Sequence, residues 1–216
     1  MKIIKQSWEF INCPNGEDLL KQIEFIGRCC YKSEEKITTD SAKVFVKKLI
    51  DSKHHAMIEH GSISVKMITD RGVTHEIVRH RVASYAQEST RYCNYSKDKF
   101  GNEITVILPV DYDWDIHGVL TDLDLVQYET WKEAMKHSEK SYMTLLRDGA
   151  SPQLARSVLP NSLKTEIVMT ANPREWRHFF TLRCSNAAHP QMKELARSML
   201  TGFQRDIPIL FDDISY

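Results

Sequence analysis

Two stretches of this 216-residue chain contain arginine but no lysine, although the chain has 12 Arg and 17 Lys in all. Residues 67–96 contain Arg71, Arg79, Arg81 and Arg91, and residues 165–192 contain Arg174, Arg177 and Arg183. Arginine presents a planar fork of fixed donors that suits a phosphate, a carboxylate or the edge of a pyrimidine, whereas lysine is a flexible point charge. The pattern therefore favours recognition of an anion by geometry. The alternative is structural salt bridges with Glu76, Glu88, Glu166 and Glu175.

Residues 79–92, RHRVASYAQESTRY, begin with three basic side chains at the end of an expected helix and continue with polar groups. An exposed loop is typically rich in Gly, Pro, Asn or Lys, and this stretch has none of them. It contains Tyr85 and Tyr92 instead. This composition predicts a lined pocket for an anion.

The string Arg79-His80-Arg81, followed after a gap of seven residues by Ser89 and then by Arg91-Tyr92, resembles the signature of the flavin-dependent thymidylate synthases. A second block is similar to the same family in order and spacing: ARSVLP at 155–160, NPR at 172–174, His178, Leu182-Arg183 and HPQ at 189–191. The segment 57–60, MIEH, also resembles the family's segment before its first sheet strand. The resemblance covers residues 54–92 and 151–192, and its motifs agree independently.

The resemblance implies a homotetramer whose active sites form between subunits. It also implies FAD as the cofactor, dUMP as the substrate, methylene-tetrahydrofolate as the one-carbon donor and NADPH as the reductant, with dTMP and tetrahydrofolate as products. No covalent protein nucleophile is required in such a reaction. An arginine held against the uracil imide would stabilise the developing anion, as an oxyanion hole does.

The resemblance also assigns roles to individual residues. The implied catalytic residue is Arg183, which would polarise the uracil imide. The implied dUMP-binding residues are Glu76, Arg79, Gln87, Glu88, Ser89, Thr90, Arg91, Arg156 and Arg183. The implied FAD-binding residues are His60, Ser62, Arg79, His80, Arg81, Gln87, Asn172, Arg174 and His178. No metal site is implied.

Two positions depart from the family pattern. Glu76 stands where many members have Gln, and a carboxylate accepts hydrogen bonds but does not donate them unless it is protonated. Ala86-Gln87 replaces a common Asn-Glu, so a carboxylate expected near the cofactor is missing. These departures concern contacts at residues 76 and 86–88 and leave the implied fold and reaction intact.

Three other readings of the sequence compete with this one. Residues 54–60, HHAMIEH, contain metal-ligand types, but on a helix His60 lies about 140° from His55, unlike the paired histidines of H-E-x-x-H. Cys93 could be a nucleophile, although a free cysteine is more often a small buried hydrophobe. A single-stranded RNA or nucleotide-binding protein could stack bases on Tyr85, Tyr92 and Tyr95. Its expected positive charge is absent, because Lys+Arg and Asp+Glu both number 29.

Length and composition indicate the class of protein that carries these motifs. A chain of 216 residues with 42% hydrophobic residues and few Gly and Pro predicts one globular domain, residues 1–216. The longest apolar run, residues 104–110, is too short to span a membrane, and the N-terminus lacks the apolar stretch of a signal peptide. Five cysteines with no C-x-x-C indicate reduced thiols. We expect a cytoplasmic protein.

The elements that position the motifs can also be predicted. Apolar periodicity and caps predict helices over 16–31, 40–53, 71–80, 122–147, 173–182 and 191–203, with a helix starting at Ser151-Pro152. Alternation or β-branched runs predict strands over 61–69, 104–108 and 163–170. No G-x-G-x-x-G or G-x-x-x-x-G-K-[ST] occurs. The expected fold is α/β of the α+β type, a single mixed helix and sheet domain, and not a Rossmann fold.

Overall fold

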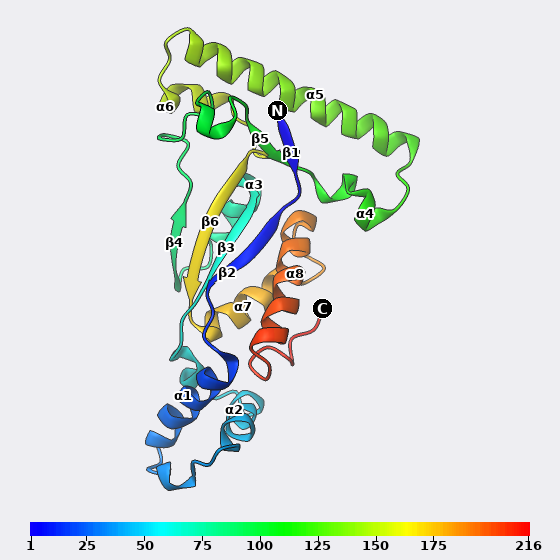
Figure 1. Ribbon diagram of the computed structural model, residues 1–216. Coiled ribbons are helices and arrows are strands. Elements are labelled where there is room, and N and C mark those ends of the chain that lie inside the picture. The colour runs from blue at the N-terminus through cyan, green and yellow to red at the C-terminus, as the bar shows by residue number, and fades with distance from the viewer. The chain divides into compact units, whose positions relative to one another are not determined.

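The computed structural model describes residues 1–216 as a mixed α/β fold with two sheets. The larger sheet has the strand order β2-β3-β6-β4 (Figure 1), in strands Ser7–Asn12, Ile63–Asp70, Lys164–Ala171 and Ala83–Gln87. As the sequence predicts, this sheet is not the doubly wound parallel sheet of a Rossmann fold. No helix combines the length and the apolar character that a membrane crossing requires.

The chain divides into two compact units, each built from three separate stretches of sequence. Unit 1 comprises residues 1–7, 67–78 and 86–167, and unit 2 comprises residues 8–66, 79–85 and 168–216. The division falls inside β3 and β6, so it follows no linker in the sequence. The single domain 1–216 therefore stays a prediction.

Unit 1 is organised around the helix α5 (Asp122–Arg147) and a small parallel sheet. In that sheet β1 (Lys2–Ile4) pairs with β5 (Thr105–Ile107). A capping box at Thr121 starts α5, because its hydroxyl accepts from the Asp124 amide and the Asp124 carboxylate accepts from the Thr121 amide. The core of the unit comprises Tyr95, Ile104, Val106, Met135, Tyr142, Ala155 and Leu163. Its remaining elements are α3 (Arg71–Ile77), α4 (Trp114–His117), α6 (Pro152–Ala155) and the 3₁₀ turns η3 (Asp98–Phe100), η4 (Val110–Tyr112) and η5 (Arg156–Val158).

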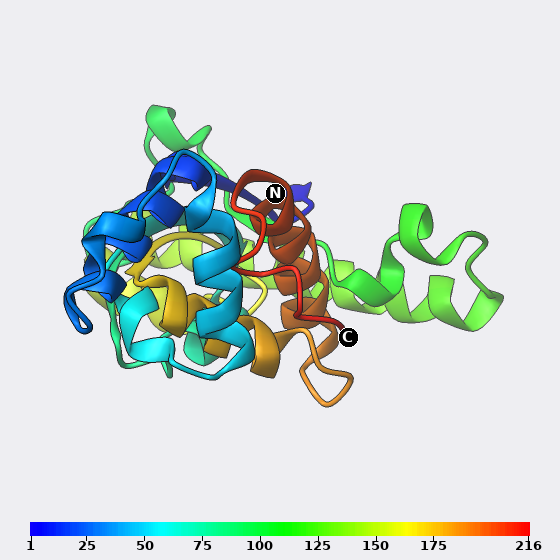
Figure 2. The same ribbon diagram turned by 90° about the horizontal axis from the view of Figure 1, so that it is seen from below.

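Unit 2 packs the helices α7 (Pro173–Arg183) and α8 (Pro190–Asp206) together, and an α1/α2 hairpin forms a second helical pair (Figures 1 and 2). The hairpin consists of α1 (Gly16–Cys29) and α2 (Ser41–Asp51), with the 3₁₀ turns η1 (Glu34–Lys36) and η2 (His55–Glu59) on either side of α2. Aromatic rings fill the core, where Trp176 stacks on Phe180 at 5.9 Å between centroids. Gly202 has no room for a Cβ, because the Trp8 indole occupies that space.

Most predicted elements are confirmed within a few residues. Apolar side chains alternate in β3 as expected, since Ile63, Val65 and Met67 are fully buried. Helix α5 has the predicted bounds, and the Ser151 hydroxyl caps α6 by accepting from the Leu154 amide. The strands β1, β2 and β4 were not predicted from the sequence.

Candidate functional site

A cavity of about 540 Å³ in unit 2 gathers three of the predicted flavin-binding residues: Asn172, Arg174 and His178. The other lining residues are His55, Glu59, Val82, Glu175, Arg177 and Thr181. Burial lowers the pKa of His55, and the charges of Arg177 and Arg174 lower it further. Glu59 and Glu175 also line the cavity, and Arg174 pairs with Glu59, so the two arginines offer directed guanidinium donors rather than a net positive charge.

Helix α7 carries most of this cavity, and its start is set by the sequence Asn172-Pro173. The Asn172 side chain accepts a hydrogen bond from the Glu175 amide at 2.9 Å, and Pro173 occupies the first helical position, where its missing N–H is not needed. Trp176, Phe179 and Phe180 are fully buried on the opposite face of the helix. This packing fixes the helix, so the side chains on its cavity face are held by the core.

A chain of hydrogen bonds links Glu175, His80 and Arg183. His80 is 3% exposed, and its Nδ1 lies 3.0 Å from Glu175 Oε1. Arg183 Nε donates to His80 Nε2 at 3.1 Å. An arginine is a donor only, so Nε2 must carry the lone pair and Nδ1 must carry the proton that it donates to Glu175. The buried carboxylate thus fixes the tautomer of His80, and the imidazole orients Arg183.

The environment of His80 keeps its ring neutral. Burial lowers the pKa of His80, the hydrogen bond to Glu175 partly opposes this, and the charge of Arg183 lowers it further. His80, Glu175 and His178 bring possible metal-ligand atoms within 4.8 Å of one another. Both ring nitrogens of His80 are already engaged, so a metal ion would have to displace Arg183 before His80 could bind it.

The other predicted flavin-binding residues of unit 2 lie at its surface. His60 and Ser62 follow the turn η2 and precede β3, and both are exposed. Arg79 and Arg81 flank the buried His80 and are also exposed. The RHR string therefore places one side chain inward and two outward, and the inward one holds Arg183.

Unit 1 contains most of the predicted dUMP-binding residues, and the structure brings two of them together. Arg156 Nη1 donates to the Thr90 hydroxyl at 3.4 Å, although the two residues are 66 positions apart. The Ser89 hydroxyl accepts from the Arg91 amide at 3.4 Å and is bonded to no histidine there. The Arg91 side chain is exposed, 5.6 Å from the Tyr92 ring centre. Residues 89–92 therefore form a short loop with Arg91 at its exposed edge, and Arg156 of η5 contacts it.

Two further residues of the predicted dUMP set are bound within unit 1 itself. The Gln87 amide donates to the Thr74 hydroxyl at 3.0 Å and more weakly to Thr165 at 3.4 Å. The Glu88 carboxylate accepts from the Tyr95 hydroxyl at 2.8 Å and from Lys164 at 3.1 Å. Glu76 is half-buried on α3. Gln87 and Glu88 therefore anchor the end of β4 beside the loop.

The structure bears on the competing readings of the sequence. Burial raises the pKa of the Cys93 thiol, and the nearby Glu88 charge raises it further, which disfavours the thiolate that a nucleophile needs. Tyr95 is 5% exposed and cannot stack on a base. Tyr85 donates its hydroxyl to the His80 carbonyl at 2.7 Å. Only Tyr92, at 79% exposed, could serve as a stacking platform.

The sequence left open that the arginines serve structural salt bridges. Two of them do form such bridges, but not with the glutamates that the sequence suggested. Arg174 pairs with Glu59 at 2.5 Å, and Arg177 pairs with Asp213 at 2.6 Å. Glu88 and Glu166 both pair with Lys164. Glu175 pairs with His80, a contact that the sequence analysis missed. The sequence signal that could have pointed to this contact is that Glu175 stands in the first turn of a helix capped by Asn172.

Comparison with known proteins places the chain among thymidylate synthases. The model of the Thy1 family, described as thymidylate synthase complementing protein, matches residues 15–209. A flavin-dependent thymidylate synthase of Mycobacterium tuberculosis (strain H37Rv) is 34% identical over 198 residues, which cover 88% of this chain and 78% of that protein. The flavin-dependent thymidylate synthase of Mycobacterium avium is 34% identical over 200 residues, with the same coverage.

Two solved structures share the fold at lower sequence identity. Both are of PolB, a UMP/dUMP methylase from Streptomyces cacaoi, one bound with 5-Br UMP and one with 5-Br dUMP. Each is 19% identical to this chain, with TM-scores of 0.78 and 0.80. The alignments cover 98% of this chain and 95% and 96% of the two PolB chains.

Proposed function

Because the chain belongs to the family of flavin-dependent thymidylate synthases, we propose that it converts dUMP to dTMP by reductive methylation. The proposed one-carbon donor is 5,10-methylenetetrahydrofolate, the reductant is NADPH and the flavin is FAD. In the balanced reaction, dUMP, methylenetetrahydrofolate, NADPH and one proton give dTMP, tetrahydrofolate and NADP⁺. We place the reaction in the cytoplasm, where reduced thiols persist, because all five cysteines are free.

The observation that carries the proposal is the hydrogen-bonded chain from Glu175 through His80 to Arg183. The uracil ring must become electron-rich at C5 before it accepts a one-carbon unit, so negative charge develops on its imide. A guanidinium that is already oriented stabilises that charge without reorganising during the reaction. The buried, neutral His80 provides this orientation, and Arg183 acts as the catalytic residue.

The cavity on α7 suits the flavin. Arg174 and Arg177 line it with guanidinium donors that could bind the phosphates of FAD, and Asn172 and His178 add polar groups at the cap and on the helix. We assign Asn172, Arg174 and His178 to FAD, with His60, Ser62, Arg79, Arg81 and Gln87 as further members of its site. His80, the remaining residue of the predicted FAD set, is buried with both ring nitrogens engaged, so it acts by orienting Arg183. A bound flavin supplies hydride transfer. The protein residues bind and orient it.

The loop of unit 1 suits the nucleotide phosphate. Ser89, Thr90 and Arg91 offer two hydroxyls and a guanidinium, and Arg156 is already bonded to Thr90. We assign these four residues to dUMP, together with Glu76, Arg79, Gln87, Glu88 and Arg183. Ser89 serves as a binding group rather than a nucleophile, because no base contacts its hydroxyl and an unactivated hydroxyl attacks poorly.

We also propose a homotetramer with active sites shared between subunits, as the family resemblance implies. Sedimentation of the purified protein tests this assembly. A monomer with full activity would contradict shared sites.

The reaction itself is tested with the purified chain. After incubation with FAD and removal of free cofactor, the protein should keep the visible absorption of a bound flavin. NADPH should then reduce that flavin, and dTMP should form only when dUMP and methylenetetrahydrofolate are both present. A protein that stays colourless and forms no dTMP would refute the proposed function.

A further inference from the structure

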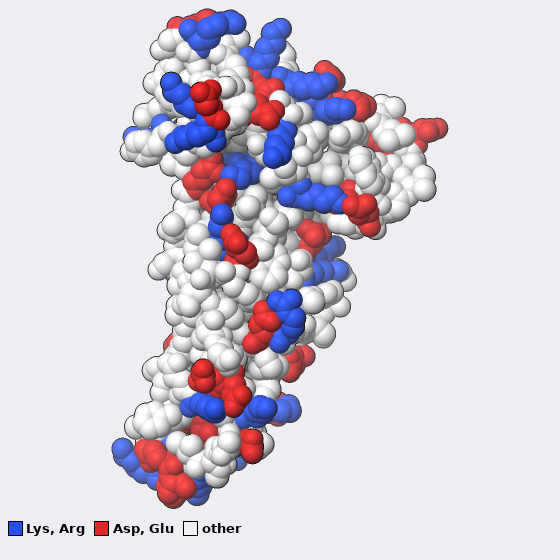
Figure 3. Space-filling view, viewed as in Figure 1, with Lys and Arg blue, Asp and Glu red and all other residues white.

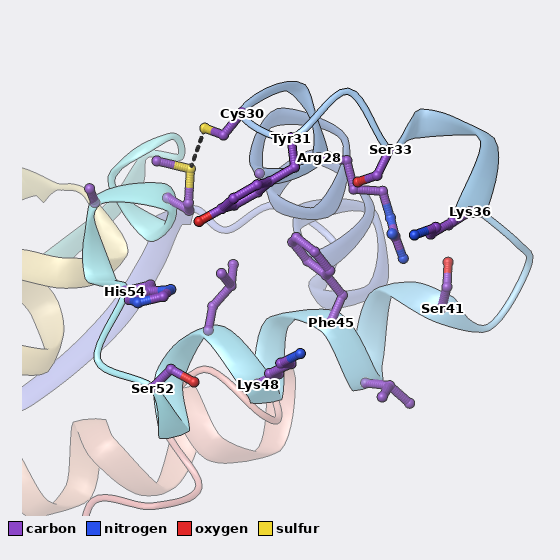
Figure 4. A pocket seen from close by; sticks show the side chains of 15 residues that line it. Arg28, Cys30, Tyr31, Ser33, Lys36, Ser41, Phe45, Lys48, Ser52 and His54 are labelled. Atoms are coloured by element: carbon purple, nitrogen blue, oxygen red, sulfur yellow. Dashed lines mark hydrogen bonds between the residues drawn. The ribbon is translucent and has the colours of Figure 1, made fainter.

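The α1/α2 hairpin of unit 2 forms an open groove of about 1090 Å³ that the proposed function does not use (Figure 4). Its walls come from the end of α1, from α2 and from residues 54–57. The Arg28 guanidinium lies 4.7 Å from the Phe45 ring centre and is held by Glu24 at 2.6 Å. A Cβ at Gly27 would lie 2.7 Å from that ring, so the glycine lets the two helices close. The cavity, called the basic groove below, is therefore built by helix packing.

The basic groove combines positive charge with exposed apolar surface. Arg28, Lys36 and Lys48 line it, and no aspartate or glutamate does. Lys36 and Lys48 are exposed and form no ion pair within the chain. Tyr31 and Val44, also in the lining, are 81% and 74% exposed. Such a surface suits an occupant that is both apolar and acidic.

A surface of the opposite character lies in unit 1. Residues 100–131 contain seven aspartates and glutamates and no lysine or arginine. Five large apolar side chains of α4, of the connection that follows it and of the start of α5 are half or more exposed: Trp114, Ile116, Val119, Leu123 and Val126. In Figure 3 the α4 region is mostly white, with red side chains at its edge. These five residues, with Asp111 and Asp122, are called the acidic surface.

The acidic surface is an ordered feature of unit 1. The Tyr112 and Trp114 rings contact the Tyr128 ring at 5.9 and 6.4 Å between centroids. Lys5 pairs with Asp113 and Asp115 and so secures the start of α4. Asp111 and Asp122 remain exposed and form no ion pair. These contacts secure the start of α4, while the five apolar side chains remain half or more exposed to water.

We propose that the acidic surface of one copy of this chain docks into the basic groove of a second copy. The two surfaces match in polarity and in charge, with Asp111 and Asp122 on one side and Lys36 and Lys48 on the other. Docking would remove the exposed apolar area of both surfaces from water. The opposite charges would fix how the two surfaces align against each other. This inference deepens the assembly in the proposed function by naming its contacting surfaces, and it does not depend on the activity.

Charge reversal tests the contact in the full chain. Lys36→Glu/Lys48→Glu in the groove, or Asp111→Lys/Asp122→Lys on the acidic surface, should each raise the dissociation constant of the assembly at least tenfold in sedimentation velocity. The quadruple variant restores opposite charges across the contact and should recover most of the association. Lys43→Glu on α2 and Asp148→Lys after α5 are matched controls outside both surfaces, and they should leave the dissociation constant unchanged.

The outcomes separate this inference from the proposed assembly. If the reversals behave like the controls, the contact is refuted and the tetramer must use other surfaces. If both reversals weaken association but the quadruple variant does not recover it, direct pairing of the two surfaces is refuted. A wild-type chain that is monomeric at all concentrations would refute both the contact and the tetramer, although dTMP formation would still test the reaction.

Discussion

The two groups of residues proposed to bind ligands differ in how far the protein itself has arranged them. In unit 2, Glu175 and His80 are buried, and the hydrogen bonds from Glu175 through His80 to Arg183 are 3.0 and 3.1 Å long. In unit 1, Arg91 is exposed, and the bonds at Ser89 and between Arg156 and Thr90 are long, at 3.4 Å. Arg183, which must stabilise the developing charge, is therefore oriented in advance. The loop assigned to the phosphate has long hydrogen bonds, and its side chains could move closer when a ligand binds.

Replacing Arg183 should have the largest effect, because it removes the end of the pre-organised chain. Arg183→Lys keeps the charge but loses the planar fork and the Nε donor to His80. We expect turnover to dTMP to fall ~10²-fold or more, with a much smaller change in dUMP affinity. Flavin reduction by NADPH should survive. Separate measurements of the three quantities in Arg183→Lys and Arg183→Ala check this, and near-normal dTMP formation at saturating dUMP would remove Arg183 from catalysis.

Glu175 should matter less, because it acts through His80. Glu175→Leu removes the acceptor of the imidazole proton, a hydrogen bond to a charged group worth roughly 1.5–3 kcal/mol. We expect dTMP turnover to fall about tenfold, at ~1.4 kcal/mol per tenfold, while dUMP KM changes little. Glu175→Gln retains an acceptor oxygen and is the matched control. Equal losses in both variants, after correction for their unfolding temperatures, would argue against orientation through His80.

A smaller effect is expected in the loop of unit 1. Ser89→Ala removes one neutral hydrogen-bonding group, which contributes about 1 kcal/mol. The dUMP affinity should fall several-fold and turnover should slow without being abolished. Equilibrium binding of dUMP and steady-state turnover measure these effects. A trapped covalent adduct between the substrate and Ser89 would contradict the binding role.

The pH dependence of stability should show the smallest effect. Because the folded pKa of His80 lies below the unfolded value of about 6.5, its contribution to stability is present above that pH and is lost as the pH falls below it. The free energy of unfolding should drop by at most ~1.4 kcal/mol per pH unit from this group. Urea unfolding between pH 7.5 and 5 measures the slope, and His80→Gln should reduce it. An unchanged slope in that variant would mean that His80 does not titrate differently on folding.

The sequence predicts the helices and the central strands well, because their information is local. The alternation of Ile63, Val65 and Met67 is visible in β3, and the box at Thr121 fixes the start of α5. Strand β1 has three residues and exists through its pairing with β5, where Lys2 lies opposite Thr105. A contact between positions so far apart leaves no local periodicity. Strand β4 carries Ser84, Tyr85 and Gln87, so its polar composition hides it.

The candidate site was predictable as a set of residues but not as an arrangement. The motifs locate His80 and Arg183, yet nothing in their spacing shows that they share a hydrogen bond. Glu175 was considered only as a partner for arginine, whereas it pairs with a histidine 95 positions earlier. Gln87 and Glu88 match the nucleotide motif, but their side chains are bonded to Thr74 on α3 and to Tyr95 in the following loop. Such tertiary pairings depend on the sheet, which the sequence shows only in part.

Helix α7 carries Glu175 and Arg183 on one continuous element, and this makes their relation sensitive to chain length. Arg183 lies eight positions after Glu175, which corresponds to about 12 Å along the helix axis and a net rotation of about 80°. One inserted or deleted residue between them would turn Arg183 by about 100° relative to Glu175. The buried Trp176, Phe179 and Phe180 would be put out of phase by the same change. Substitutions on this helix can be absorbed one side chain at a time, whereas an indel would break the core and the hydrogen-bonded chain in a single step.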